Sequence, residues 1–387
     1  MKAWLILADG TVFEGSAIGA TGTTIGETVF TTGMTGYVET LTDPSYFGQI
    51  VTQTFPLIGN YGVMPEDFES KKSWVRGYIL RELCEEPSNF RCGGDLNSFL
   101  KAQGVVGICG IDTRALTKRL RESGVMNGMI ASGMENCPGV TESLLKEIQS
   151  YKIEKSVETV TCREGEASPS LQPAPQSSAT PSAEAGCPRN APARHIVLWD
   201  FGAKANIQRE LEKRGCRVTL VPCGTTAQQI LALKPDGLML SNGPGDPADN
   251  TGIISEITKL CEYGKLPIFG ICLGHQMLAL ARGCKTSKLK YGHRGGNHPV
   301  KDTATGRVYI TSQNHGYAVE NDSLPPFARQ SFVNENDSTC EGVTYSDIPA
   351  FSVQFHPEAC GGPHDTNFLF DRFITLIDDR APVSQGE

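Results

Sequence analysis

One short segment places a candidate nucleophile where its neighbours favour reactivity. Cys272 stands between Gly270 and Gly274, directly after the apolar run 266–271 and directly before a run of helical pattern. The order strand, sharp turn, helix is that of an elbow that presents a nucleophile, and flanking glycines let other chain segments approach closely. The amide groups and the dipole at the start of a helix stabilise an anion there. The pattern therefore predicts that Cys272 acts as a thiolate nucleophile.

A histidine and an acid with matching spacing follow near the end of the chain. His356 and Glu358 lie two positions apart in the segment FHPE, which ends a strand-like run. In an extended chain, positions i and i+2 face the same side, so the carboxylate of Glu358 can fix the tautomer of the His356 imidazole. By itself this tripeptide is more often an ordinary strand end. Together with the elbow it predicts a triad in which Cys272 is the nucleophile. His275, the competing base, follows the helix face and is expected to be structural.

Two glycine-containing segments could complete the site. Residues 241–247 (SNGPGDP) follow the third expected strand, where an open α/β sheet has its ligand crevice, and their amides could stabilise an oxyanion. Residues 314–317 (NHGY) offer amide and backbone groups to a polar ligand. Spacing alone leaves open the alternative that both segments are ordinary Gly/Pro or Asn/Gly turns.

The elements that must position these residues follow a β-α-β pattern in the second half of the chain. Short apolar runs, typical of buried strands, alternate with segments of helical spacing, as a parallel sheet requires. The expected strands are 195–200, 216–222, 237–240 and 266–271, and the expected helices are 206–214, 227–233, 253–263 and, at the end, 367–377. Between 291 and 358 the segments alternate with turns, which indicates additional, partly antiparallel strands. We therefore predict an α/β fold with a C-terminal, doubly wound, mostly parallel sheet.

The first part of the chain reads as a separate, β-rich α/β domain. Strand-like pieces occupy 3–7, 12–14, 26–32 and 49–54, and a helical stretch covers 113–123. Between Cys162 and Arg194, Pro, Ser and Ala dominate, so this stretch cannot offset its chain entropy by burying apolar surface. The predicted organisation is an N-terminal domain over 1–155, a linker over 156–193, a second domain over 194–380 and a tail over 381–387.

Composition and charge argue against several classes of protein. The 387 residues carry a formal net charge of −8 without a cluster of Lys and Arg, which argues against nucleic-acid binding. No apolar window approaches membrane-spanning length, and the apolar run before Asp9 is too short for a signal peptide, so we expect a cytoplasmic protein without a membrane contact. The 13 cysteines include no C-x-x-C pair, which argues against a zinc cage and against a disulfide framework. We expect reduced thiols, no metal and no cofactor in this chain.

The motifs of the second half occur in the order of a known family. The segments SNGPGDP, GICLGHQ, QNHGYAV and FHPE make this domain similar to the class I glutamine amidotransferases along its whole length. The first domain resembles the small-subunit family of carbamoyl-phosphate synthetases in two segments, 32–51 (TGMTGYVETLTDPSYFGQIV) and 107–130 (GICGIDTRALTKRLRESGVMNGMI).

The resemblance implies a role for each triad residue. Cys272 attacks the side-chain amide of glutamine, and Glu358 orients the imidazole of His356. His356 protonates the departing ammonia and then activates water against the γ-glutamyl thioester. The amides of Gly243 and Leu273 would stabilise the oxyanion. The residues that correspond to the family's glutamine pocket are Ser45, Gly243, Gly245, Leu273, Gln276, Asn314, Gly316 and Tyr317. Relatives commonly carry Phe at position 317, a change that keeps the ring.

The resemblance also implies a partner chain. The family's small subunit forms a heterodimer with a large, ATP-binding synthetase subunit. With ATP, Mg, bicarbonate and the ammonia, this ligase makes carbamoyl phosphate for pyrimidine and arginine biosynthesis. The present sequence has no Gly-x-x-x-x-Gly-Lys-Ser/Thr loop for nucleotide binding, and ten residues follow the expected closing helix. We therefore expect the synthetase to be a separate chain.

Three alternatives differ in what the sequence would have to contain. A thiol hydrolase of another amide would share the elbow and the triad but would not need the first domain. A glutaminase subunit for anthranilate or guanylate synthesis would lack segments 32–51 and 107–130. A non-catalytic scaffold predicts a lost nucleophile, whereas Cys272, His356 and Glu358 are all present.

Overall fold

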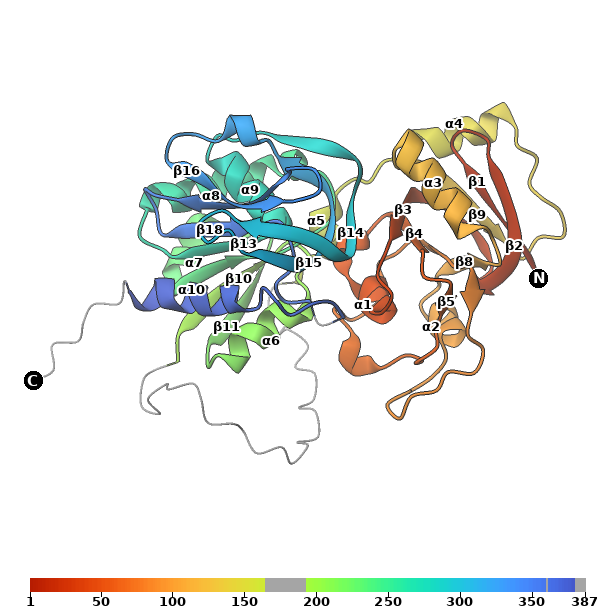
Figure 1. Cartoon of the computed structure of the whole chain (residues 1–387), viewed down its shortest axis with the longest axis horizontal. Helices are drawn as coiled ribbons and strands as arrows, with labels where there is room; N and C mark the ends of the chain where they lie inside the picture. The colour runs from red at the N-terminus through yellow and green to blue at the C-terminus, as the bar shows by residue number, and fades with distance from the viewer. Residues whose placement is uncertain (164–192, 360, 380–387) are drawn as a thin grey trace, which may run out of the picture.

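The chain folds into two lobes that meet along one side of each (Figure 1). A computed structural model of the chain describes residues 1–163, 193–359 and 361–379. Most of the expected linker over 156–193 therefore lies outside the described residues. The expected tail over 381–387 lies entirely outside them. Among the helices in the described ranges, none is both long and apolar enough to cross a membrane.

The N-terminal lobe is built on a closed barrel with the strand order β1-β2-β8-β6-β4-β3-β9. The barrel strands are β1 (Lys2–Leu7), β2 (Val12–Gly19), β3 (Gly22–Thr31), β4 (Gln49–Gln53), β6 (Gly77–Ile79), β8 (Val106–Cys109) and β9 (Met126–Ser132). A small two-stranded sheet pairs β5 (Leu57–Ile58) with β7 (Glu82–Leu83). Closure pairs both edges of the sheet, so within the described part of this lobe the barrel leaves no long free strand edge.

Short helices surround this barrel. They are α1 (Tyr37–Thr42), η1 (Pro44–Tyr46), η2 (Pro65–Asp67), α2 (Leu96–Ala102), α3 (Thr113–Ser123) and α4 (Glu142–Ser150). The next helix, α5 (Ser156–Val160), packs on the C-terminal lobe, where Val157 shares a core with Trp199. The alternation along β1 explains how it is covered: Leu5 packs in one core with Leu120 of α3, whereas its neighbour Ile6 packs in another with Ile148 of α4. The expected strand-like pieces and the helix over 113–123 are thus present, and the prediction of a β-rich N-terminal domain is confirmed.

The C-terminal lobe contains one large mixed sheet with the order β11-β10-β12-β13-β18-β17-β16-β14-β15. Its strands are β10 (His195–Asp200), β11 (Arg217–Pro222), β12 (Gly237–Leu240), β13 (Ile268–Ile271), β14 (Thr286–Asp302), β15 (Val308–Val319), β16 (Ala328–Asn334), β17 (Cys340–Tyr345) and β18 (Ala350–Val353). The five strands from β11 to β18 in this order are mutually parallel, and those from β17 to β15 pair antiparallel. The predicted parallel sheet with added antiparallel strands is confirmed.

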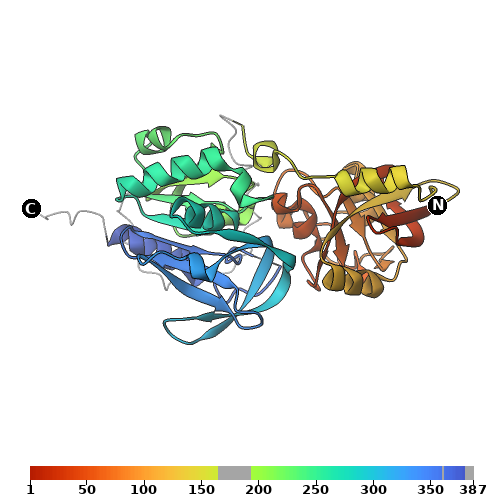
Figure 2. The same ribbon diagram turned by 90° about the horizontal axis from the view of Figure 1, so that it is seen from above.

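Helices cover both faces of the parallel part of this sheet. They are α6 (Ala205–Lys213), α7 (Ala227–Ala232), η3 (Pro247–Asp249), α8 (Thr251–Tyr263), α9 (Leu273–Ala281), η4 (Asn321–Ser323) and α10 (Phe368–Asp378). Trp199 of β10 packs with α7, α8 and α9, whereas Leu198 packs with α6 and α10 on the other side. In Figure 2, α7 and α8, in green, lie on the opposite side of the sheet from α10, in blue. Because both faces are buried, the parallel strands read as continuous apolar runs.

The two lobes meet where the long hairpin β14–β15 approaches the barrel (Figure 1). Thr32, just after β3, donates its backbone N–H to the carbonyl oxygen of Arg294 at 3.2 Å. Lys288 of β14 forms an ion pair with Glu27 of β3 at 2.7 Å. The loop after α1 and the 3₁₀ helix η1 face the carboxyl ends of the parallel strands, where the candidate site lies.

Candidate active site

The backbone at Cys272 forms a strained elbow. Cys272 follows β13, precedes α9 and has φ 52° and ψ −103°, a conformation that costs a non-glycine residue about 1–3 kcal/mol. A Cβ on Gly274 would lie 2.4 Å from the carbonyl oxygen of Leu240, and one on Gly270 would lie 2.9 Å from that of Gly274. The two flanking glycines are therefore required by close backbone approach, as the sequence pattern predicted. The thiol of Cys272 is oriented by the carbonyl oxygen of Asn314 at 3.7 Å.

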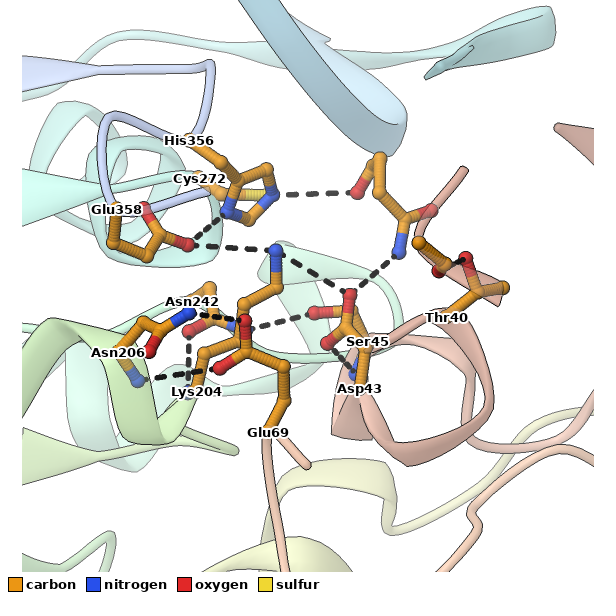
Figure 3. Close-up of polar contacts among 12 residues, drawn as sticks. Thr40, Asp43, Ser45, Glu69, Lys204, Asn206, Asn242, Cys272, His356 and Glu358 are labelled. Carbon is orange, nitrogen blue, oxygen red and sulfur yellow. Dashed lines mark hydrogen bonds and ion pairs between the residues drawn. The ribbon is translucent and has the colours of Figure 1, made fainter. Parts of the chain in front are cut away.

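His356 and Glu358 form a buried pair beside this elbow (Figure 3). Nδ1 of His356 lies 2.7 Å from Oε1 of Glu358, and both side chains are inaccessible to solvent. Burial and Lys204 act to lower the pKa of His356, but Glu358 and Cys272 outweigh them and raise it to about 9. Burial acts to raise the pKa of Glu358, but His356 and Lys204 lower it to about 2. The structure thus brings the three residues of the predicted triad together, with Nε2 of His356 left without a hydrogen-bond partner.

A buried lysine that the sequence analysis did not identify lies behind the pair. Nζ of Lys204 is 3.4 Å from Oε1 of Glu358 and 3.6 Å from Oδ2 of Asp43 in the N-terminal lobe. Asp43 also accepts a hydrogen bond from Nδ2 of Asn314 at 3.1 Å. Figure 3 shows the ammonium group of Lys204 between the two carboxylates. Lys204 stands just after β10 without a neighbouring motif, so only the packing of the two lobes reveals it.

A second buried acid, Glu69, extends the same cluster. Its carboxylate accepts hydrogen bonds from the backbone N–H of Asn206 at 3.2 Å and from its side-chain amide at 2.9 Å. Burial raises the pKa of Glu69 to about 7, against the influence of Lys204. Glu69 belongs to the N-terminal lobe and Asn206 to α6, so this contact ties the two lobes together beneath the triad.

Cys272 lies in the wall of a cavity of about 420 Å³. Of the eight residues expected to bind glutamine, seven line it: Ser45, Gly243, Gly245, Gln276, Asn314, Gly316 and Tyr317. The eighth, Leu273, is buried and opens α9, so its backbone N–H lacks an intrahelical partner. Only glycine fits at position 243, because a Cβ there would lie 2.2 Å from the carbonyl oxygen of Phe201.

Ser45 reaches this cavity from the N-terminal lobe because Asp43 shapes its loop. The carboxylate of Asp43 accepts the backbone N–H of Ser45 at 2.9 Å and starts the 3₁₀ helix η1. The hydroxyl of Ser45 then accepts a hydrogen bond from Nδ2 of Asn242 at 2.9 Å. Asn242 is fully buried and also accepts the backbone N–H of Lys204 at 3.0 Å. The sequence analysis named the surrounding segment but not Asn242 itself.

The other side of the cavity is fixed by Gln276 and the strand β15. Nε2 of Gln276 donates to the carbonyl oxygen of Tyr317 at 2.8 Å and to Oε1 of Gln354 at 2.9 Å. Burial, together with the neighbouring carboxylate of Asp246, raises the pKa of the Tyr317 hydroxyl. The segment 314–317, which spacing alone could not separate from an ordinary turn, therefore forms a strand wall of the cavity.

Charged side chains missed by the sequence analysis also line the cavity. Arg294 is buried, and its guanidinium donates to the carbonyl oxygen of Tyr291 at 2.7 Å while Nε has no partner. Glu27 and Lys288 form an ion pair at the same cavity. These residues lie outside the four motifs, and only the approach of β14 to the barrel brings them to the site.

The remaining histidine and cysteine candidates behave as structural groups. Nδ1 of His275 lies 2.8 Å from the hydroxyl of Ser352, and burial lowers the pKa of His275 to about 3. Burial raises the pKa of Cys216 to about 11 and those of Cys261 and Cys340 to about 12, as expected for inert thiols in a core. These three cysteines have neither a strained elbow nor a neighbouring His–Glu pair.

Comparison with known proteins agrees with this two-lobe arrangement. The family described as "Carbamoyl-phosphate synthase small chain, CPSase domain" matches residues 5–130, and "Glutamine amidotransferase class-I" matches residues 197–376. The carbamoyl phosphate synthase small chain of Symbiobacterium thermophilum is 48% identical over 98% of this chain and 99% of its own. That of Listeria monocytogenes serotype 4b is 50% identical over 98% of each chain. The pyrimidine-specific small chain of Bacillus subtilis is 48% identical over 98% of this chain and 96% of its own. This chain therefore belongs to the family of small, amidotransferase subunits of glutamine-dependent carbamoyl-phosphate synthase.

Proposed function

We propose that this chain hydrolyses glutamine through a Cys272, His356 and Glu358 triad and delivers the ammonia to a large synthetase subunit. One observation carries the proposal: the 2.7 Å contact between His356 and Glu358 lies beside a strained cysteine elbow in the wall of a cavity. Backbone strain at a nucleophile and a buried imidazole–carboxylate pair beside it are both typical of a covalent catalyst.

In the first half of the reaction, the sulfur of Cys272 forms a bond to the side-chain carbonyl carbon of glutamine. The carbonyl oxygen becomes an oxyanion, for which the amides of Gly243 and Leu273 are the candidate donors. The C–N bond then breaks as His356 gives its proton to the nitrogen, and ammonia leaves. A γ-glutamyl thioester on Cys272 remains. The raised pKa of His356 supports this role, because the imidazole is protonated when the leaving group needs a proton.

In the second half, water replaces the sulfur. The imidazole of His356 takes a proton from the water, the oxygen attacks the thioester carbon and the C–S bond breaks, which releases glutamate. Glu358 keeps the imidazole oriented in both halves. Lys204 contacts the same oxygen of Glu358 and so holds the carboxylate ionised and in place.

The charges of the cavity suit a free amino acid. Glutamine carries an α-carboxylate and an α-ammonium group, which need partners of opposite sign when they leave water. Arg294 and Lys288 offer positive charge and Glu27 and Asp246 offer negative charge along the cavity wall. This arrangement supports a zwitterionic substrate rather than the side chain of a protein.

A second cavity, of about 370 Å³, gives the ammonia a way out. It lies between the lobes, and its wall includes Asp43, Lys204 and Asn314. Asn314 lines both cavities, so the two are neighbours on either side of this residue. We propose that ammonia passes by this route to the large subunit, whose ATP and Mg convert it with bicarbonate into carbamoyl phosphate. The relative named pyrimidine-specific supports a role in pyrimidine biosynthesis, and arginine biosynthesis is the second proposed use of the product.

The test is to express this chain alone and with a large subunit, and to measure glutamate release and carbamoyl phosphate formation. Cys272→Ser is expected to abolish glutamate release and glutamine-dependent synthesis while synthesis from added ammonia continues. Cys137→Ser, at an exposed cysteine, is the matched control and should retain both activities. Hydrolysis of glutamine at the native rate by Cys272→Ser would contradict the proposal.

A further inference from the structure

A second group of buried polar side chains borders the proposed glutamine cavity, whose wall includes His315, and has no part in the proposed reaction. His293 of β14, His315 of β15 and Glu341 of β17 each offer a ligand atom, and these atoms lie within 4.8 Å of one another. The exposed fractions are 7%, 5% and 0%. The amide oxygen of Gln313, 2% exposed, lies among them. Within the described residues no other such group of His, Cys, Asp and Glu occurs.

The spacing of these atoms is close to that of a four-coordinate metal site. Oε1 of Gln313 lies 3.2 Å from Nδ1 of His293 and 2.8 Å from Nε2 of His315. Nδ1 of His293 lies 3.5 Å from Oε1 of Glu341. In a tetrahedral zinc site with bonds of about 2.0–2.1 Å, neighbouring ligand atoms are about 3.4 Å apart. Small side-chain shifts are therefore enough to close the set around one ion.

Each of three candidate ligands, His293, His315 and Glu341, also has a hydrogen-bond partner outside the group, as metal ligands usually do. Nε2 of His293 lies 2.8 Å from Oδ2 of Asp337, and Nδ1 of His315 lies 2.7 Å from the carbonyl oxygen of Tyr317. Asn334 donates to Glu341 at 2.9 Å. Histidine ligands usually donate their second N–H to a carboxylate or a carbonyl in this way, which leaves the other nitrogen's lone pair for the metal.

The two imidazole rings face more hydrogen-bond acceptors than neutral imidazoles have N–H groups to donate. His315 faces an oxygen at each nitrogen, that of Tyr317 and that of Gln313, although a neutral imidazole has only one N–H. His293 also lies between two acceptors, Asp337 and Gln313, and only an imidazolium with both N–H groups satisfies the two. Oε2 of Glu341 is buried without any partner. A cation at the centre of the group would satisfy the lone pairs that now face one another.

We propose that His293, His315, Glu341 and Gln313 bind one divalent transition-metal ion. Mixed imidazole and oxygen ligands suit zinc among the common ions, and cobalt(II) can report on the same geometry. All four ligands come from the protein, so the ion is structural rather than catalytic. It would fix the strand segment that contains Asn314 and Gly316, the neighbours of His315 in the glutamine cavity. This differs from the expectation of no metal that the sequence alone supported.

The test measures metal content in the full-length, tag-free chain with Cys272→Ser, which removes the candidate nucleophile as a zinc-binding thiol. After chelator treatment and gel filtration, the chain is titrated with zinc and separately with cobalt(II). About one equivalent of each is expected, and cobalt should give the intense visible absorption of a four-coordinate site. Glu341→Gln, which keeps size and the bond from Asn334, should abolish this binding. The matched control is Glu335→Gln. Glu335 is an exposed acid in the connection between β16 and β17, and it forms an ion pair with Lys301.

Asp337→Asn supplies a second variant that leaves all four ligands intact. It should weaken zinc affinity by roughly 10- to 100-fold, because it removes the group that orients His293. Circular dichroism on every variant checks that it is folded. The proposal is overturned if the folded parent chain takes up no zinc or cobalt, or if Glu341→Gln binds both as tightly as the parent. Because the readout is metal and not glutamine turnover, these outcomes are independent of the proposed reaction.

Discussion

The side-chain amide of Asn242 donates a hydrogen bond to the hydroxyl of Ser45 at 2.9 Å, across the boundary between the two lobes. The two residues are 197 positions apart in the chain. Both atoms are buried, and Ser45 lines the cavity next to Cys272. The proposed glutamine site is therefore complete only when both lobes are in place.

Ser45→Ala is expected to raise KM for glutamine roughly 2- to 10-fold with a smaller change in kcat, because a neutral hydrogen bond contributes about 0.5–1.5 kcal/mol. Glutaminase kinetics on the purified chain measure the effect. Ser16→Ala, at an exposed position of β2, is the control and should behave as the parent. An unchanged KM for Ser45→Ala would mean that Ser45 does not contact the substrate.

The protonation of His356 should depend on Glu358. With Glu358 present the pKa of His356 is about 9, whereas burial and Lys204 act to lower it. Glu358→Gln is therefore expected to lower the midpoint of the His356 titration by at least about one pH unit. NMR with ¹³C-labelled histidine measures this, and His275, whose pKa burial lowers to about 3, should stay neutral throughout as an internal reference.

The same shift predicts how stability varies with pH. The folded-state pKa of His356 lies above the ordinary value of 6.5, so its contribution to stability is fully present below pH 6.5 and is lost as the pH rises through about 9. The urea midpoint of the parent should fall between pH 7 and 9 by more than that of His356→Asn. Equal falls in both proteins would show that the charge pair does not exist in solution.

Glu69 should make the protein less stable as the pH rises toward neutrality. Its folded-state pKa is about 7, above the ordinary value of 4.5, so the unfolded chain releases this proton first and stability falls between pH 4.5 and 7. The loss is at most about 3 kcal/mol. Glu69→Gln keeps the contact with Asn206 but should remove this part of the pH dependence, as urea unfolding at pH 5 and 7.5 would show. Glu66→Gln, exposed on η2, should not.

Gly274 should tolerate no side chain. Gly274→Ala places a Cβ 2.4 Å from the carbonyl oxygen of Leu240, so the elbow must shift. We expect a destabilisation of about 1–3 kcal/mol and loss of glutaminase activity. Gly252→Ala in α8 is the matched control, because open space surrounds its Cβ and alanine favours a helix by up to about 1 kcal/mol. Thermal unfolding and glutamate release compare the two, and a fully active Gly274→Ala would refute the steric argument.

Arg294 should contribute to glutamine binding. Arg294→Met removes the buried positive charge of the cavity wall and is expected to raise KM for glutamine roughly 10- to 100-fold, the range for a hydrogen bond to a charged group. Lys152→Met, at an exposed residue of the same cavity, is the control. If both variants bind glutamine like the parent, the α-carboxylate has another partner.

The sequence by itself determined the parallel part of the C-terminal sheet and the candidate reacting groups. The parallel strands and the elbow could be predicted because a buried strand is a continuous apolar run, and because a nucleophile between two glycines is a local pattern of strand, turn and helix. His356 and Glu358 could be paired because two residues of an extended chain share a face. The pocket residues followed from motifs that resemble a family.

Only the tertiary structure decided which distant side chains surround these groups. Lys204 meets Asp43 and Glu358, and Arg294 enters the cavity, because a barrel and a mixed sheet pack against each other. Neither residue stands in a periodic pattern or a motif. Contacts between the lobes depend on how the surfaces of the two folded lobes fit together. The spacing of residues along the chain does not specify this fit.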